Sequence, residues 1–131
     1  MDRHRNILSP APLVVIVDDD DAVRNSLKFS LEIDGFTVTT YASADELLHA
    51  GDLSGCECLI VDQHMPRMTG LELVESLRKQ GIGAPAILMS GHVTPTLMRL
   101  AAGVGIPVIE KPIPGNKLIE FIRAALDGKP N

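Results

Sequence analysis

The feature that most constrains this chain is a regular alternation of short aliphatic runs with amphipathic helical patterns. Residues 13–17 have the sequence LVVIV, the continuous aliphatic run expected of a strand buried on both faces of a parallel sheet. After this run, Val23, Leu27 and Leu31 recur at helical spacing until Gly35, a residue type that ends helices. The unit repeats along the chain, and we expect strands at residues 13–17, 36–40, 58–61, 86–89 and 108–109, each followed by a helix.

Helix starts support this division. The segments 43–46 (SADE) and 69–72 (TGLE) fit capping boxes, and Thr94-Pro95 places a capping hydroxyl before a proline suited to the first helical position. Strict alternation with short links predicts an α/β fold, in which a five-stranded parallel sheet with right-handed crossovers carries helices on both faces. The carboxyl ends of all strands in such a sheet lie at one edge, where ligands bind.

The length fits a single domain, which we place at residues 13–127, after a polar leader at 1–12 and before a short tail at 128–131. A chain of 131 residues buries roughly two-thirds of its unfolded surface, so its core needs no metal or disulfide. Cys56 and Cys58 are two positions apart, so on a strand they are expected to point the same way, as reduced thiols with a structural role.

Composition excludes several classes of partner. The 12 Lys and Arg residues against 17 Asp and Glu give a net charge of −5, which argues against binding to nucleic acid. No apolar run approaches the about 18 residues of a membrane helix, and the N-terminal segment lacks the pattern of a signal peptide. We therefore expect a cytoplasmic protein without membrane contact.

Chemically active side chains follow four of the five expected strands. Residues 18–21 are four consecutive aspartates after the first strand, Asp62 follows the third, Ser90 the fourth and Lys111 the fifth. Clustered carboxylates repel unless a cation lies among them, and their oxygens suit Mg²⁺. A lysine and a hydroxyl at the same edge indicate a further anion, such as a phosphoryl group carried by one carboxylate as an acyl phosphate.

Each of these residues also has a simpler interpretation. Asp20 and Asp21 are better explained as the cap and first turn of the following helix. Ser90 alone would be an ordinary turn residue, and Lys111 alone a solvated surface lysine that contributes little to stability. Only their convergence on one edge favours a site.

Four motifs, in this order, carry a resemblance to a known family: Val-Asp18-Asp19, the segment 61–70 (VDQHMPRMTG), Met-Ser90-Gly91-His92 and Glu110-Lys111-Pro112. Together they resemble the receiver domain of two-component response regulators, over residues 13–126 and with FixJ-like receivers in particular. The resemblance implies a flavodoxin-like sheet with strand order 2-1-3-4-5. It also implies phosphorelay signalling, with a sensor histidine kinase or a histidine phosphotransfer protein as phosphodonor.

The resemblance implies roles for individual residues. Asp62 would be the phosphoacceptor, and Lys111 would pair with a phosphoryl oxygen. Mg²⁺ would be held by Asp62, by Asp19 and, directly or through water, by Asp18, with the backbone carbonyl of His64 completing the ligands.

Ser90 would be the switch hydroxyl that moves toward the phosphoryl group. His64 and His92 would tune hydrolysis of the acyl phosphate. An equally good interpretation is that both are polar loop residues that simply face water. Val108 departs from the pattern, because receivers usually carry an aromatic residue there and its rotation cannot occur in this chain.

Two other functions remain open on the sequence. Residues 19–23 (DDDAV) after an aliphatic strand match the nucleophile motif of haloacid dehalogenase-type phosphohydrolases, with Asp19 as nucleophile, but that family needs an acidic pair after its lysine. The second alternative is a pseudo-receiver, an interaction module that does not depend on phosphorylation. We expect a phosphoacceptor signalling domain rather than an enzyme. Because no DNA-binding domain follows residue 128, we expect a stand-alone receiver that acts through contact with an unidentified protein target.

Overall fold

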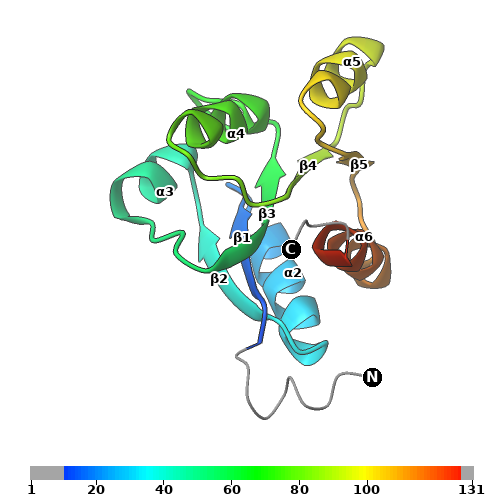
Figure 1. Cartoon of the computed structure of the whole chain (residues 1–131). Coiled ribbons are helices and arrows are strands. Elements are labelled where there is room, and N and C mark those ends of the chain that lie inside the picture. The colour runs from blue at the N-terminus through cyan, green and yellow to red at the C-terminus, as the bar shows by residue number, and fades with distance from the viewer. Residues whose placement is uncertain (1–10, 128–131) are drawn as a thin grey trace.

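The computed structural model describes residues 11–127. The expected tail at 128–131, and the expected leader except for its last two residues, therefore lie outside the described residues. Five strands alternate with five helices (Figure 1): β1 (Leu13–Val17), α2 (Asp21–Ile33), β2 (Thr37–Tyr41), α3 (Ala44–Ala50), β3 (Cys56–Asp62), α4 (Gly70–Lys79), β4 (Ala86–Ser90), α5 (Pro95–Gly103), β5 (Val108–Glu110) and α6 (Gly115–Asp127).

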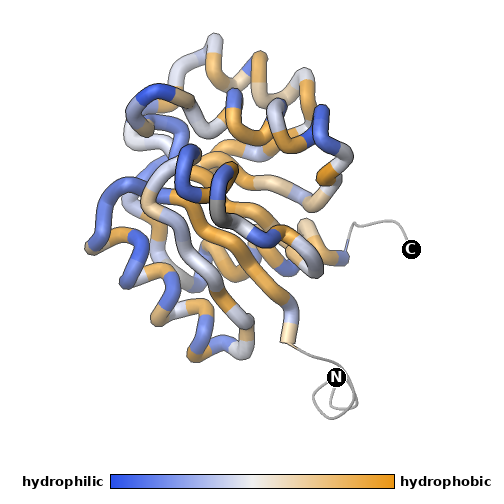
Figure 2. Tube along the Cα trace, turned by 90° about the vertical axis from the view of Figure 1, so that its left-hand side faces the viewer, coloured by the Kyte–Doolittle hydropathy of each residue, from blue (hydrophilic) through white to orange (hydrophobic). Residues whose placement is uncertain are grey.

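All five strands are parallel and lie in the order β2-β1-β3-β4-β5, which confirms the predicted sheet. The central strand residues alternate between two apolar clusters, as the period of a strand requires. Val14 and Ile16 face Leu31 of α2 and Ile122 of α6, whereas Val15 and Val17 belong to the cluster formed with α3, α4 and α5. Helices thus cover both faces, and the sheet between them is the hydrophobic layer in Figure 2.

The first strand has the expected bounds, and the ends of the other four strands differ from the expectation by at most two residues. The capping box at Thr69 forms, because its hydroxyl accepts from the Glu72 N–H and the Glu72 carboxylate accepts from the Thr69 N–H. The box expected at Ser43 forms only in part. The Ser43 hydroxyl accepts from the Glu46 N–H, but the Glu46 carboxylate accepts from the N–H of Ala42, one residue earlier than a capping box requires.

The expectation that Cys56 and Cys58 point the same way is wrong. Leu13 pairs with Cys56 and Val14 with Cys58, so Glu57 is the extra residue of a bulge in β3. Cys56 consequently packs against the cluster under α3 to α5, and Cys58 lies in the cluster under α2 and α6.

None of the helices within residues 11–127 has the length and apolar character that a membrane span requires.

Candidate functional site

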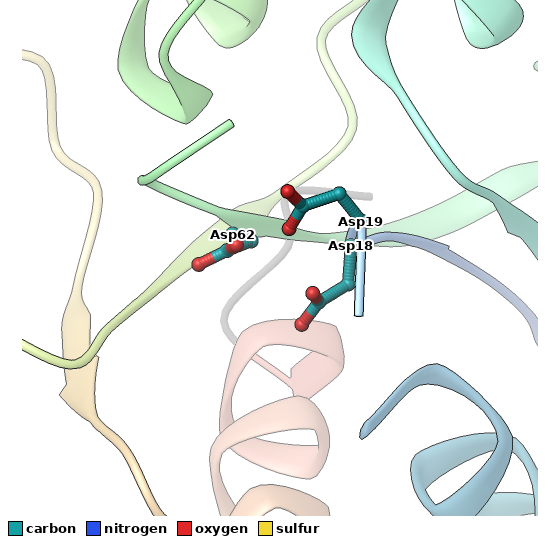
Figure 3. Close-up of side chains that lie close together, drawn as sticks. All are labelled: Asp18, Asp19 and Asp62. Carbon is teal, nitrogen blue, oxygen red and sulfur yellow. The ribbon is translucent and has the colours of Figure 1, made fainter. Parts of the chain in front are cut away.

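The carboxyl ends of the strands bring the predicted residues together at one edge of the sheet. Asp18 follows β1, Asp62 and Ser90 are the last residues of β3 and β4, and Lys111 follows β5. Asp18 and Ser90 are fully buried, and Asp62 is 4% exposed. Carboxylate oxygens of Asp18, Asp19 and Asp62 all lie within 4.8 Å of one another (Figure 3).

Lys111 connects the two buried carboxylates. Its ammonium donates to Asp18 Oδ2 at 3.1 Å and lies 3.2 Å from Asp62 Oδ1. The side chain of Lys111 is 22% exposed, so it is less accessible than the solvated surface lysine that its position alone suggested. The lysine is a partly buried cation between two buried anions.

Burial and neighbouring charges have opposing effects on the pKa values of Asp62 and Lys111. Burial raises the pKa of Asp62, and the charge of Asp18 raises it further, while Lys111 and the backbone N–H of His64 lower it. Burial disfavours the Lys111 ammonium, but Asp18 and Asp62 outweigh burial and raise the pKa of this lysine. The site therefore keeps its lysine charged and holds one carboxylate that is unfavourable as an anion unless another cation joins it.

The two oxygens of Asp62 differ in their surroundings. Oδ1 lies near Lys111 and is 3.5 Å from the His64 N–H, whereas no hydrogen bond within residues 11–127 reaches Oδ2. Every fully buried side-chain oxygen or nitrogen of the described residues has a hydrogen-bond partner. Oδ2 is therefore the oxygen of Asp62 that no donor of residues 11–127 engages.

The acidic loop after β1 is held in place by backbone and side-chain contacts. The Asp18 N–H donates to the carbonyl of Tyr41 at 3.1 Å, and Asp18 Oδ1 accepts from the Asp20 N–H at 2.9 Å. Asp20 caps α2 by accepting from the Val23 N–H, and Asp21 lies in its first turn, as expected. Asp19, between Asp18 and Asp20, is exposed, and its carboxylate turns toward Asp62 at the rim of the site (Figure 3).

Arg24 is a supporting residue whose role could not be assigned from the sequence. Its guanidinium donates to the backbone carbonyl of Asp18 at 2.6 Å and forms an ion pair with Asp21. The side chain of Arg24 is 14% exposed. One turn of α2 thus fixes the loop that carries Asp18 and Asp19. Only the position of an arginine one turn into the helix after an acidic run could have suggested this contact.

Gly70 is a second supporting residue that the sequence did not reveal. A Cβ atom at this position would lie 2.5 Å from the carbonyl oxygen of Asp62, so α4 can begin directly against the end of β3 only with glycine here. The Gly70 N–H also donates to the carbonyl of Gln63 at 3.1 Å. The start of α4 therefore supports the backbone on which Asp62 lies.

The hydroxyl of Ser90 lies within a group of loop contacts. It donates to the His92 carbonyl at 3.0 Å and accepts from the His92 N–H at 3.1 Å. His64 Nε2 lies 3.1 Å from the same hydroxyl. His64 and His92 thus contact Ser90, the first through its ring and the second through its backbone. Val108 begins β5 beside Leu88 and is partly buried against the cluster under α3 to α5.

The donor set fits a hard divalent cation. Three carboxylates on two strand ends supply oxygen ligands, and Mg²⁺ commonly binds through one or two carboxylates plus water and a substrate phosphate.

Close to Lys111, a cavity of about 510 Å³ lies between α2 and the segment after β5, lined by Ala22, Val23, Ser26, Leu27, Met89, Lys111, Pro112 and Ile113.

Comparison with known proteins agrees with this geometry. The family model described as the response regulator receiver domain matches residues 14–123. The transcriptional regulatory protein FixJ of Azorhizobium caulinodans is 40% identical over 114 residues, covering 86% of this chain and 54% of that protein. The response regulator protein TodT of Pseudomonas putida is 33% identical over 123 residues, covering 93% of this chain and 54% of that protein. The chain thus spans about half the length of these relatives.

Solved structures share the fold. The crystal structure of FixJ-N has a TM-score of 0.79 at 36% identity, covering 91% of this chain and 96% of that one. The chemotaxis protein CheY4 of Vibrio cholerae has a TM-score of 0.81 at 26% identity, covering 88% of this chain and 99% of that one.

Proposed function

The chain belongs to the response regulator receiver domain family, and from this premise we propose that it accepts a phosphoryl group on Asp62 from the phosphohistidine of a sensor histidine kinase or a histidine phosphotransfer protein. The observation that carries this proposal is the position of Lys111 between Asp18 and Asp62. A cation shared by two buried carboxylates is already in place to pair with a phosphoryl oxygen.

The proposed reaction is a direct transfer between two side chains. Asp62 Oδ2, which accepts no hydrogen bond from residues 11–127, attacks the phosphorus of the donor, the P–N bond to the donor imidazole breaks, and an acyl phosphate forms. Lys111 pairs with one phosphoryl oxygen, and Ser90 donates to another after its hydroxyl turns. Mg²⁺ bound by Asp18, Asp19, Asp62 and the carbonyl of His64 would neutralise the remaining charge.

The geometry favours Asp62 over Asp19 as the nucleophile. Lys111 contacts Asp62 and Asp18, whereas Asp19 is exposed and has no ion pair within residues 11–127. A haloacid dehalogenase-type hydrolase would also need an acidic pair after its lysine. The acidic residues after Lys111 are Glu120 and Asp127, which lie in α6.

The output of the phosphorylated chain is proposed to be a changed contact with another protein. The relatives that the chain matches are about twice its length, and FixJ is a transcriptional regulatory protein. The net charge of the chain is −5, which disfavours binding to the nucleic-acid backbone. We therefore propose that residues 11–127 do not bind nucleic acid directly.

The proposal is tested by incubating the protein with acetyl phosphate and Mg²⁺ and locating the modified residue. Reduction of an acyl phosphate with borohydride converts the aspartate to homoserine, which mass spectrometry assigns to one position. We expect the label at Asp62, its loss in Asp62→Asn and its retention in the control Asp34→Asn, which removes an exposed carboxylate paired with Arg123. A label at Asp19 would support the hydrolase instead, and undiminished labelling of Asp62→Asn would overturn the proposal.

A further inference from the structure

We propose that the ring of His64 holds Ser90 in its unphosphorylated position, and that this hydrogen bond, called here the His64–Ser90 latch, must break when the site is phosphorylated. The inference rests on the proposed function, because it assigns Ser90 as the hydroxyl that turns toward the phosphoryl group. It makes His64 a positioning residue that opposes the switch. Its ring contact, Nε2 to Oγ at 3.1 Å, joins the loop after β3 to the end of β4.

The hydrogen-bonding capacity of Ser90 is fully used. A serine hydroxyl has one hydrogen to donate and two lone pairs that accept. Its hydrogen goes to the His92 carbonyl, and one lone pair accepts from the His92 N–H. In the His64 tautomer that carries a hydrogen on Nε2, the ring donates to the remaining lone pair, and all three contacts of Ser90 are satisfied together.

This arrangement conflicts with donation to a phosphoryl group. To donate to an oxygen on Asp62, the hydroxyl has to withdraw its hydrogen from the His92 carbonyl and turn, which changes the direction of both lone pairs. Ser90 is fully buried, so a hydrogen bond lost at its hydroxyl is not readily replaced by one to water. Its loss therefore costs free energy. The latch therefore favours the unphosphorylated state.

His64 is also tied to the phosphoacceptor. Its backbone N–H lies 3.5 Å from Asp62 Oδ1, only two residues along the chain. The ring belongs to an exposed residue, so it can leave Ser90 for solvent without displacing core side chains. The other two contacts of Ser90 use the backbone of His92, so the side chain of His64 is the part of this arrangement that a substitution can remove.

The test compares His64→Leu, which fills similar space without a donor, with His64→Gln, which retains an N–H donor. The probe is beryllofluoride with Mg²⁺, an analogue of the phosphoryl group, and its affinity is measured by titration followed in NMR spectra. The exposed His49, whose Nδ1 lies 2.8 Å from the carbonyl oxygen of Asp45 in α3, supplies the matched control His49→Leu.

We expect His64→Leu to bind beryllofluoride about 2- to 10-fold more tightly, the range that corresponds to loss of one neutral hydrogen bond from the free state. His64→Gln and His49→Leu should match the unsubstituted protein. In a Ser90→Ala background, His64→Leu should have no further effect. Unchanged or weaker binding by His64→Leu, or the same gain without Ser90, would overturn the latch.

The free protein provides a second readout that does not depend on phosphorylation. The amide signal of Gly91, next to Ser90, should shift in His64→Leu and not in His64→Gln. If the unsubstituted protein fails to bind beryllofluoride, the proposed function fails. The Gly91 signal then still decides the latch, which is wrong if the two His64 variants give the same spectrum.

Discussion

The ammonium of Lys111 lies 3.2 Å from the carboxylate of Asp62, although the two residues come from the ends of β5 and β3 and the whole of β4 lies between these strands. The long lysine side chain reaches across the edge of the sheet to make this contact. It makes a second one at 3.1 Å with Asp18, so removal of a single side chain alters the charge balance of the whole site.

Lys111→Met should destabilise the protein in buffer without Mg²⁺ by about 1–3 kcal/mol. Removing the lysine leaves the buried carboxylates of Asp18 and Asp62 without their cation. Because Lys111 is 22% exposed, the decrease in the free energy of unfolding should be smaller than for a fully buried pair. Urea unfolding with and without Mg²⁺ measures the effect, and the ion should recover part of it. Lys28→Met, which removes an exposed pair with Glu32, should cost no more than about 0.5 kcal/mol. Equal losses in the two variants would contradict this account.

The stability of the protein should decrease as the pH rises through the titration of Asp62. The pKa of Asp62 is raised above its ordinary value of 3.8, so in this window the folded state binds the proton more tightly than the unfolded state does. Asp62→Asn should therefore be more stable than the unsubstituted protein at neutral pH without Mg²⁺. The difference should shrink as the pH falls toward 3.8. Unfolding curves at several pH values check this, and parallel pH profiles would exclude it.

Arg24→Ala should weaken Mg²⁺ binding by about tenfold, the lower end of the range for residues that orient metal ligands. The variant loses the hydrogen bond to the Asp18 carbonyl that fixes the acidic loop. Isothermal titration with Mg²⁺ measures the affinity. The control is Arg123→Ala, which removes an exposed pair with Asp34 and a contact with the ring of Phe36, distant from the acidic loop. An equal effect of both variants would show that Arg24 acts only through general stability.

Gly70→Ala should destabilise the protein by about 1–3 kcal/mol, because the new methyl group would overlap the Asp62 carbonyl and force the backbone to move. Phosphorylation by acetyl phosphate should slow in the same variant, since Asp62 is displaced. Gly103→Ala, at the end of α5 with no atom within 4 Å of the added methyl group, should be neutral or slightly stabilising. Thermal unfolding and the labelling rate together test this pair.

Residues close in sequence account for the parts of the fold that could be predicted. The aliphatic run at 13–17, the spacing of Leu27 and Leu31 and the capping box at Thr69 all appear as expected, because strand burial, helix periodicity and capping depend on short-range pattern. The bulge at Glu57 left no such pattern. It arises from pairing with β1, and it reversed the expected orientation of Cys56 relative to Cys58.

By itself, the sequence determined the order of strands and helices and which residues follow each strand, and because parallel strands share one carboxyl edge, this was enough to bring Asp18, Asp62, Ser90 and Lys111 together. Only the tertiary structure decided how these groups contact one another. It placed the partly buried Lys111 between two carboxylates, directed Arg24 to the Asp18 carbonyl, and brought the His64 ring to the Ser90 hydroxyl. Such contacts depend on side-chain direction and on packing between distant segments, which no local pattern encodes.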